Sequence, residues 1–455
     1  MRRLILPICF VLGACVPHTS GDVPSRAALQ PVSTMPVMKT FAVPHPAPSS
    51  RSNYDIARDF LDLSMQLESG RELKVLSRFE GPITVRVTGT PPPSLLPDLN
   101  RLLHRLRTEA GLDINRVRGQ GANITIQAVP RAEIRRHLPN AACFVVPNIS
   151  NLSQYQSAKR NRQANWSQLK VREKLAIFLP NDSSPQEVRT CLHEELAQAI
   201  GPLNDLYRLP DSVFNDDDFH TVLTGFDMLI LQAYYAPELR SGMSRREVAI
   251  QLPTILSRLN PDGDTYPSEE EHTTPRAWVK AIQTTLFSDA DASQRLGAAQ
   301  YALRVAVSEG WTDHRRGFSH YVVGRLIRKS NPEHAQSQFA KADAYFSINP
   351  NTELHRSRVA IELASYAISK GQGETALSIL QPNLAVAERY ENAAILANLM
   401  MLQAEALELT GRMAEARVVR LDSLGWARYG YGADWVIRAK LLEIASLNPL
   451  KGTNG

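Results

Sequence analysis

The sequence has few cysteines and no long apolar run, and each of these absences excludes a class of protein. Four cysteines occur among 455 residues, and no two of them form a Cys-x-x-Cys pair. The chain is therefore neither a disulfide-rich scaffold nor a carrier of that kind of structural zinc site. No stretch reaches the ~18 uninterrupted apolar residues of a transmembrane helix.

A concentrated positive charge is also missing. Lys plus Arg number 51 against 46 for Asp plus Glu, and the net charge of +5 is spread over the chain without a basic block between aromatic residues. We therefore expect no nucleic-acid partner. With 43% hydrophobic and 21% charged residues, a chain of this length is expected to fold into two or three domains.

The N-terminus predicts export and lipidation. Two arginines precede a short apolar run over residues 4–12, and two small residues precede Cys15. This pattern resembles the lipobox of bacterial lipoproteins, which implies a signal peptide over residues 1–14 and a membrane anchor of acyl chains on Cys15. Ordinary secretory cleavage is the alternative. Because Val16 is not an aspartate, we expect sorting to the outer membrane, facing the periplasm.

The rest of the chain divides by its sequence pattern. Residues 15–50 are rich in Pro, Ser and Thr and predict an extended tether. Over residues 51–242, alternating runs predict an α+β domain with a mixed sheet and one central helix. A helical connector over 243–290 then leads to an all-α domain over 291–455. The expected strands are 83–87, 123–126, 143–146 and 175–179, and the expected early helices are 54–67 and 95–110.

The all-α domain carries a weak repeat. Motifs that end at Ala335, Ala376 and Ala416 each follow an apolar helix and open another, about 40 residues apart. They resemble divergent tetratricopeptide-type hairpins. An irregular helical bundle is the alternative. We expect this domain to bind another protein of the cell envelope.

The central helix raises the question of chemistry. It begins after Ser184 and Pro185, which suit an N-cap and a first turn, and it runs to Gly201. Glu195 comes between the polar pair of Glu194 and Gln198 and the apolar stripe, so its carboxylate should be partly buried and needs a partner or a raised pKa. The apolar stripe consists of Leu192, Leu196, Ala199 and Ile200.

His193 and Glu194 begin a possible zinc-binding His-Glu-x-x-His motif, which fails because Ala197 occupies the second histidine position. We therefore expect His193 to be a histidine of the surface or of the core edge. Shifting the frame by one residue gives a longer pattern that resembles the metzincin signature HExxHxxGxxHD. The three metal-ligand positions carry Glu194, Gln198 and Asn204, and the general-base glutamate, turn glycine and trailing aspartate are retained as Glu195, Gly201 and Asp205.

The resemblance continues downstream. Residues 212–215, with Phe214, stand where such families have a Ser-x-Met turn, and residues 223–237 resemble the closing helix. The stretch 175–237 is thus similar to a matrixin-like metallopeptidase with changed ligands. The motif around Cys191, behind a lipoprotein signal, also resembles a family of proteobacterial putative lipoproteins known as domain of unknown function 2927, over roughly 55–250. That family implies no established activity.

The altered ligands decide the functional prediction. Oxygen atoms of Glu, Gln and Asn are poor substitutes for imidazole at zinc, and without a metal Glu195 has no activated water. We expect no cofactor and a pseudopeptidase that serves as a binding or scaffold protein. The alternatives are a hydrolase with a divalent metal on this ligand set and a metal-independent use of the cluster. Residues 216–218 with His220 could form a rival metal site, but a solvated acidic loop is favoured.

Cys143 and Cys191 are the two cysteines that remain after the signal peptide and Cys15. In an exported protein we expect them to form a disulfide, which would join the central helix to the sheet. Two buried thiols that never meet are the alternative.

Overall fold

The structure is a computed structural model that describes residues 35–42, 47–119, 121–217, 219–268, 273–287 and 289–451. All of these ranges belong to one compact unit, Met35–Gly455. The predicted signal peptide and Cys15 lie outside the described residues. In the described part of the chain, no helix combines the length and apolar character needed to cross a membrane.

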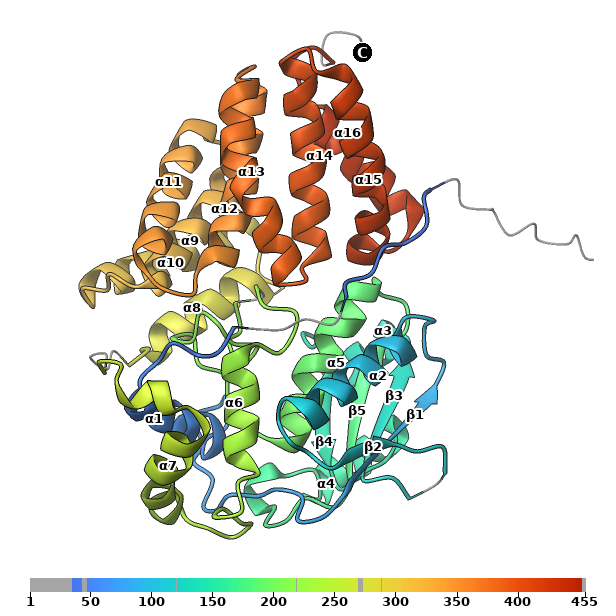
Figure 1. Ribbon diagram of the computed structural model, residues 1–455, viewed down its shortest axis with the longest axis vertical. Helices are drawn as coiled ribbons and strands as arrows, with labels where there is room; N and C mark the ends of the chain where they lie inside the picture. Colours follow the sequence, from blue (N-terminus) through green and yellow to red (C-terminus); the bar gives the residue numbers. More distant parts are fainter. Residues whose placement is uncertain are drawn as a thin grey trace, which may run out of the picture. The chain divides into compact units, whose positions relative to one another are not determined.

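The first part of the chain contains a five-stranded mixed sheet in the order β2-β1-β3-β5-β4 (Figure 1). Neighbouring strands are parallel except for β4, which lies at the edge and runs antiparallel to β5. The predicted mixed sheet is confirmed, and β2 is the strand that the sequence analysis missed. The strands are β1 (Ile83–Gly89), β2 (Ile114–Arg116), β3 (Ile124–Val129), β4 (Phe144–Pro147) and β5 (Leu175–Pro180).

Helices cover both faces of this sheet. One apolar cluster joins β1, β3 and β5 to α2 (Leu95–Thr108) and to the central helix α5 (Pro185–Ile200). A smaller cluster on the other face joins β4 and β5 to α3 (Arg131–His137) and α4 (Tyr155–Arg160). Short 3-10 turns occur at Leu152–Gln154 and Trp166–Gln168.

Three more helices complete the larger cluster: α1 (Asn53–Ser64), α6 (Gly225–Tyr234) and α7 (Arg245–Leu259). The first of these ends three residues before the predicted Leu67, because the chain turns back on itself in an isolated bridge between Gln66 and Glu72. The last lies in the predicted connector but buries Val248, Leu252, Ile255 and Leu256 in the first core.

The rest of the described chain is helical. After a 3-10 turn at Pro261–Asp264, helix α8 (Arg276–Phe287) contributes Trp278 and Ile282 to a second apolar cluster. The predicted connector is therefore divided between the two cores. The remaining helices are α9 (Ala292–Ser308), α10 (His314–Ile327), α11 (Pro332–Ile348), α12 (Glu353–Ser369), α13 (Gly373–Arg389), α14 (Ala393–Leu409), α15 (Met413–Tyr431) and α16 (Asp434–Ala445).

Buried polar contacts join the two parts. Arg189 of α5 forms a buried ion pair with Glu391, in the turn between α13 and α14. The next residue in that turn, Asn392, accepts a hydrogen bond from Gln186 Nε2 at 3.0 Å. Asp98 of α2 accepts a hydrogen bond from the Tyr429 hydroxyl at 2.9 Å. The α/β part thus presents α5 and α2 to the helical part.

Residues 35–42 lie against α15, a contact that the sequence analysis did not predict for the tether region. Phe41 is buried and stacks on Trp426, with ring centroids 4.6 Å apart. The backbone N–H of Lys39 donates to the carbonyl of Gly425 at 3.0 Å, and its side chain pairs with Asp422.

Candidate functional site

The predicted disulfide between Cys143 and Cys191 is confirmed. It joins the residue before the edge strand β4 to the middle of α5, with the two Cα atoms 5.9 Å apart. Cross-linking over 48 residues of sequence separation limits the conformations of the unfolded chain and so stabilises the fold. Both cysteines line the cavity that is described next.

A cavity of about 1170 Å³ lies beside α5 and β4. The α/β part supplies one side of it, and residues of α8, α12, α14, α15 and the turn after α13 supply the rest. Four of the predicted site residues line this cavity, namely Glu194, Glu195, Gln198 and Asp205. Three carboxylates that the signature did not include also line it, namely Glu68, Glu187 and Asp216.

Glu195 is the most unusual of these residues. Its side chain is 4% exposed, and Oε2 has no hydrogen-bond partner. Burial and the nearby charges of Glu194 and Glu68 raise the pKa of Glu195 well above its ordinary value. The predicted burial and raised pKa of this carboxylate therefore occur together.

Asp205 and Glu68 are two carboxyl groups that lie close enough to influence each other's ionisation. Burial, then the charges of Glu68 and Asp216, raise the pKa of Asp205 well above its ordinary value. Desolvation by the surrounding protein, followed by the charge of Asp216, raises the pKa of Glu68. The side chain of Glu68 still reaches solvent. Two neighbouring carboxyl groups disfavour each other's ionised form, so each of them gives up its proton less readily than an isolated acid.

The structure does not bring Asn204 to the cavity with the other ligand positions. Its side-chain Nδ2 donates to the backbone carbonyl of Asp62 in α1, at 3.0 Å. The side chain therefore ties the segment after α5 to α1. Gly201 ends α5 where a Cβ atom would come within 2.6 Å of Leu231, so glycine permits the close approach of α6.

Arg172 supports the end of α5 from outside the motif. This buried guanidinium donates to the backbone carbonyls of Gln198 and Ala199 at 2.8 Å, and to that of Gly201 at 2.6 Å. Cationic groups at a helix C-terminus satisfy the last carbonyls and stabilise the helix dipole. Sequence reasoning missed this residue because no local pattern links it to a helix that ends 28 positions later.

His193 is fully enclosed, so its predicted place at the surface or core edge is wrong. Its Nδ1 accepts a hydrogen bond from the backbone N–H of Leu223 at 3.1 Å. Burial, followed by the charges of Arg189, Arg105 and Arg101, lowers the pKa of His193 well below its ordinary value. It is a neutral side chain that holds the segment before α6 against α5.

The turn that contains Phe214 is held by the closing helix. Ser212 Oγ donates to Asp227 Oδ1 at 2.5 Å, and the N–H of Val213 donates to Asp227 Oδ2 at 3.1 Å. Phe214 is fully buried, and its carbonyl accepts from the N–H of Leu206 at 2.9 Å. Asp227 is also the third residue of a capping box with Thr224. The Ser-x-Phe turn and the Leu-Thr-x-x-Asp segment are therefore one hydrogen-bonded unit.

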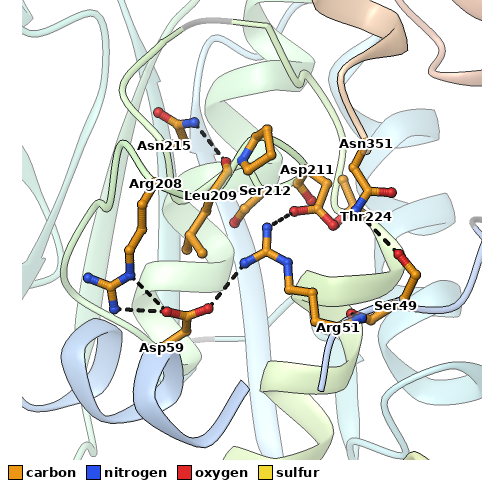
Figure 2. Close-up of polar contacts among 12 residues, drawn as sticks. Ser49, Arg51, Asp59, Arg208, Leu209, Asp211, Ser212, Asn215, Thr224 and Asn351 are labelled. Carbon is orange, nitrogen blue, oxygen red and sulfur yellow. Dashed lines mark hydrogen bonds and ion pairs between the residues drawn. The ribbon is translucent and has the colours of Figure 1, made fainter. Parts of the chain in front are cut away.

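A second network fixes the same loop to α1. Figure 2 shows Arg51 between Asp59 and Asp211, with Arg208 on the other side of Asp59. Arg208 Nε donates to Asp59 Oδ1 at 2.9 Å, and Asp59 is almost completely buried. These alternating charges join the loop between Asp205 and α6 to α1.

The predicted solvated acidic loop at 216–218 is wrong at its central residue. Asp217 is buried, and its Oδ2 accepts from Asn215 Nδ2 at 2.9 Å and pairs with His355 Nε2 at 3.0 Å. His220 is also buried, and its Nε2 donates to the carbonyl of Pro210 at 2.9 Å. Asp217 therefore links the loop to α12, while Asp218 lies outside the described residues.

The structure does not bring the ligand positions of the signature together in one cluster. Within the described ranges, no three His, Cys, Asp or Glu residues are placed so that they could hold a metal ion. Asn204 is bonded to the backbone of α1, whereas Glu194 and Gln198 line the cavity. The site instead offers buried carboxylates with raised pKa values.

Comparisons with known proteins support one part of this description. No curated protein matches the chain, and no solved structure matches it. A family model described as "Protein of unknown function (DUF2927)" matches residues 53–254. This range begins at α1 and ends within α7, so it covers the sheet and the helices of the first core. The match supports the resemblance drawn from the sequence: residues 53–254 are similar to the DUF2927 family.

Proposed function

We propose that this chain is a lipid-anchored binding protein of the bacterial cell envelope, in which a metallopeptidase-like domain binds peptides without cleaving them. The observation that carries this proposal is the state of the signature residues. Glu195, at the general-base position, lines the cavity with an unpartnered oxygen, whereas Asn204, at a ligand position, is bonded to α1.

The edge strand supports a peptide as the ligand. β4 pairs with β5 on one side and ends the sheet on the other. Residues 141–145, which include the start of β4, line the cavity. An extended peptide can pair with such an edge through its main chain and place alternate side chains in the adjacent cavity. The cavity and the edge strand would then act as one binding site.

The helical part supports a second contact with an envelope protein. Gly371 and Gly411 have positive φ angles of 73° and 77° and precede α13 and α15, about 40 residues apart. This spacing favours divergent tetratricopeptide-like hairpins, which commonly present binding surfaces. Large apolar side chains are exposed on the last two helices, namely Val418, Leu421, Trp435 and Leu442.

Three measurements test the proposal. Metal analysis of protein purified without a histidine tag should find about 0 equivalents of bound divalent metal per chain. Wild type and Glu195→Gln should both leave an unfolded protein substrate intact. Labelling with an alkyne fatty acid should mark wild type and not Cys15→Ser.

A metal-dependent hydrolase is the second candidate. It is favoured by the place of Glu195, which is at the general-base position of the signature and lines the cavity. About one equivalent of metal, with hydrolysis that Glu195→Gln reduces by several orders of magnitude, would replace the binding proposal with this one.

A further inference from the structure

Acidic residues outnumber basic ones among the described residues that line the cavity. The bases are Lys280 and Arg358. Even without Glu187, which pairs with Arg131, five acids line the cavity against these two bases. A cleft of one charge sign concentrates ligands of the opposite sign. The acids that line the cavity are Glu68, Glu187, Glu194, Glu195, Asp205 and Asp216.

Two oxygen atoms in this group lack a partner. Glu195 Oε2 and Asp205 Oδ1 are both buried and accept no hydrogen bond, and the whole Glu195 side chain is 4% exposed. An ionised carboxylate can only accept hydrogen bonds, and leaving a buried acceptor unsatisfied is costly. A cationic donor would bond these oxygens in their ionised state, would favour that state over the protonated one, and would reduce the repulsion among the carboxylates.

An ammonium group fits this requirement better than a metal ion. Metal ions need several oxygen ligands within about 2.0–2.6 Å, and the described side chains do not provide three suitable ligands together. An ammonium group carries three rotatable N–H donors and bonds carboxylates at about 2.7–2.9 Å. It can thus reach separate acceptors without a fixed coordination geometry.

The other walls of the cavity suit an aliphatic stem. Apolar side chains from several elements line it together with the acids. Long cationic side chains bury their methylene groups along such surfaces and place the charge at the polar end. The apolar residues include Leu67, Leu138, Phe144, Trp166, Leu203 and Val213.

We infer that this cavity binds a primary ammonium group on an aliphatic stem, the chemistry shared by a peptide lysine and a free alkylamine, with Glu195 and Asp205 as its acceptors. The inference rests on the proposed binding function and names the ligand class of that same site. It also explains a buried carboxylate that lacks a partner of its own: the ligand supplies the partner.

Calorimetric titration of the full mature protein tests this inference with three probes: acetyl-Ala-Lys-Ala-amide, the matched peptide with norleucine in place of lysine, and n-pentylamine. The lysine peptide should bind at least about tenfold more tightly than the norleucine peptide. This ratio corresponds to the contribution of about one strong hydrogen bond. Glu195→Gln should remove that preference. Glu443→Gln, on the exposed side of α16, is the matched control and should behave as wild type.

The outcomes separate this inference from the proposed function. Equal affinity for the two peptides would overturn the ammonium site and leave peptide binding intact. Cleavage of the lysine peptide would overturn the proposed function. Binding of n-pentylamine without either peptide would support the ammonium site and assign it to free amines. If none of the three probes binds, the inference is wrong.

Discussion

Two buried glutamates, one in each part of the molecule, differ in what surrounds them. Glu405 of α14 is 3% exposed, and its carboxylate accepts from Arg420 Nη2 at 2.9 Å, Asn448 Nδ2 at 3.0 Å and Lys451 Nζ at 2.7 Å. Glu195 of α5 is 4% exposed, and Oε2 has no partner. Burial is therefore the same in both places, and only the set of partners distinguishes a structural carboxylate from a candidate site.

The two parts of the molecule also differ in covalent support, which gives the largest expected effect. Replacing both Cys143 and Cys191 with alanine should lower the free energy of unfolding of the α/β part by about 4 kcal/mol. Hydrogen exchange followed by mass spectrometry should show the loss of protection in β3, β5 and α5 first. Equal losses in α13 and α14 would mean that the two parts unfold as one unit.

A smaller loss is expected at the satisfied glutamate. Glu405→Gln keeps the shape of the side chain but removes the charge that Arg420 and Lys451 face, and it should lower the free energy of unfolding by about 2 kcal/mol. Urea denaturation measures the change. Glu415→Gln removes one partner of the exposed pair with Arg412 and should cost much less stability, because exposed ion pairs contribute little. If both variants lose the same stability, the contacts of Glu405 contribute no more than a surface pair.

The smallest effect has the opposite sign. Because the pKa of Glu195 is raised in the folded state, ionising this carboxylate destabilises the fold. The loss begins as the pH rises past the ordinary glutamate value of about 4 and is complete above the raised value. The glutamine of Glu195→Gln cannot ionise. At pH 8 the free energy of unfolding of this variant should therefore be about 1 kcal/mol higher than that of wild type.

The advantage of Glu195→Gln should shrink toward pH 5, which urea denaturation at several pH values would reveal. A variant less stable than wild type at pH 8 would mean that the ionised carboxylate has partners in the folded state. Glu195→Gln would then destabilise the fold, as Glu405→Gln is expected to do.

Much of the first core could be predicted because its pattern is local. Ser184 and Pro185 begin α5 as expected, since an N-cap and a first-turn proline are properties of adjacent residues. β2 was missed because three residues, of which one is buried, carry no period. The overlong prediction for α1 has a similar cause, because Gln66 pairs with a residue that comes after a turn.

Only the part of the candidate site that lies on α5 or shortly after it could be predicted. The spacing within α5 predicted that Glu195 is buried, and Asp205 follows from the same signature. Glu68 comes from a turn far earlier in the sequence and meets Asp205 only through the fold. Asp217 was taken for a solvated residue because its partner His355 is 138 positions away. Long-range electrostatic pairs leave no periodic trace in a sequence.

The contact of residues 35–42 with α15 has a mechanical consequence. A pull on the chain before Met35 would reach the backbone bond between Lys39 and Gly425 and the stacking of Phe41 on Trp426 before it reached the sheet. These contacts follow one another along a single segment, so tension would break them one after another. Tension on the chain would thus be taken up by this segment before it could change the geometry of the cavity.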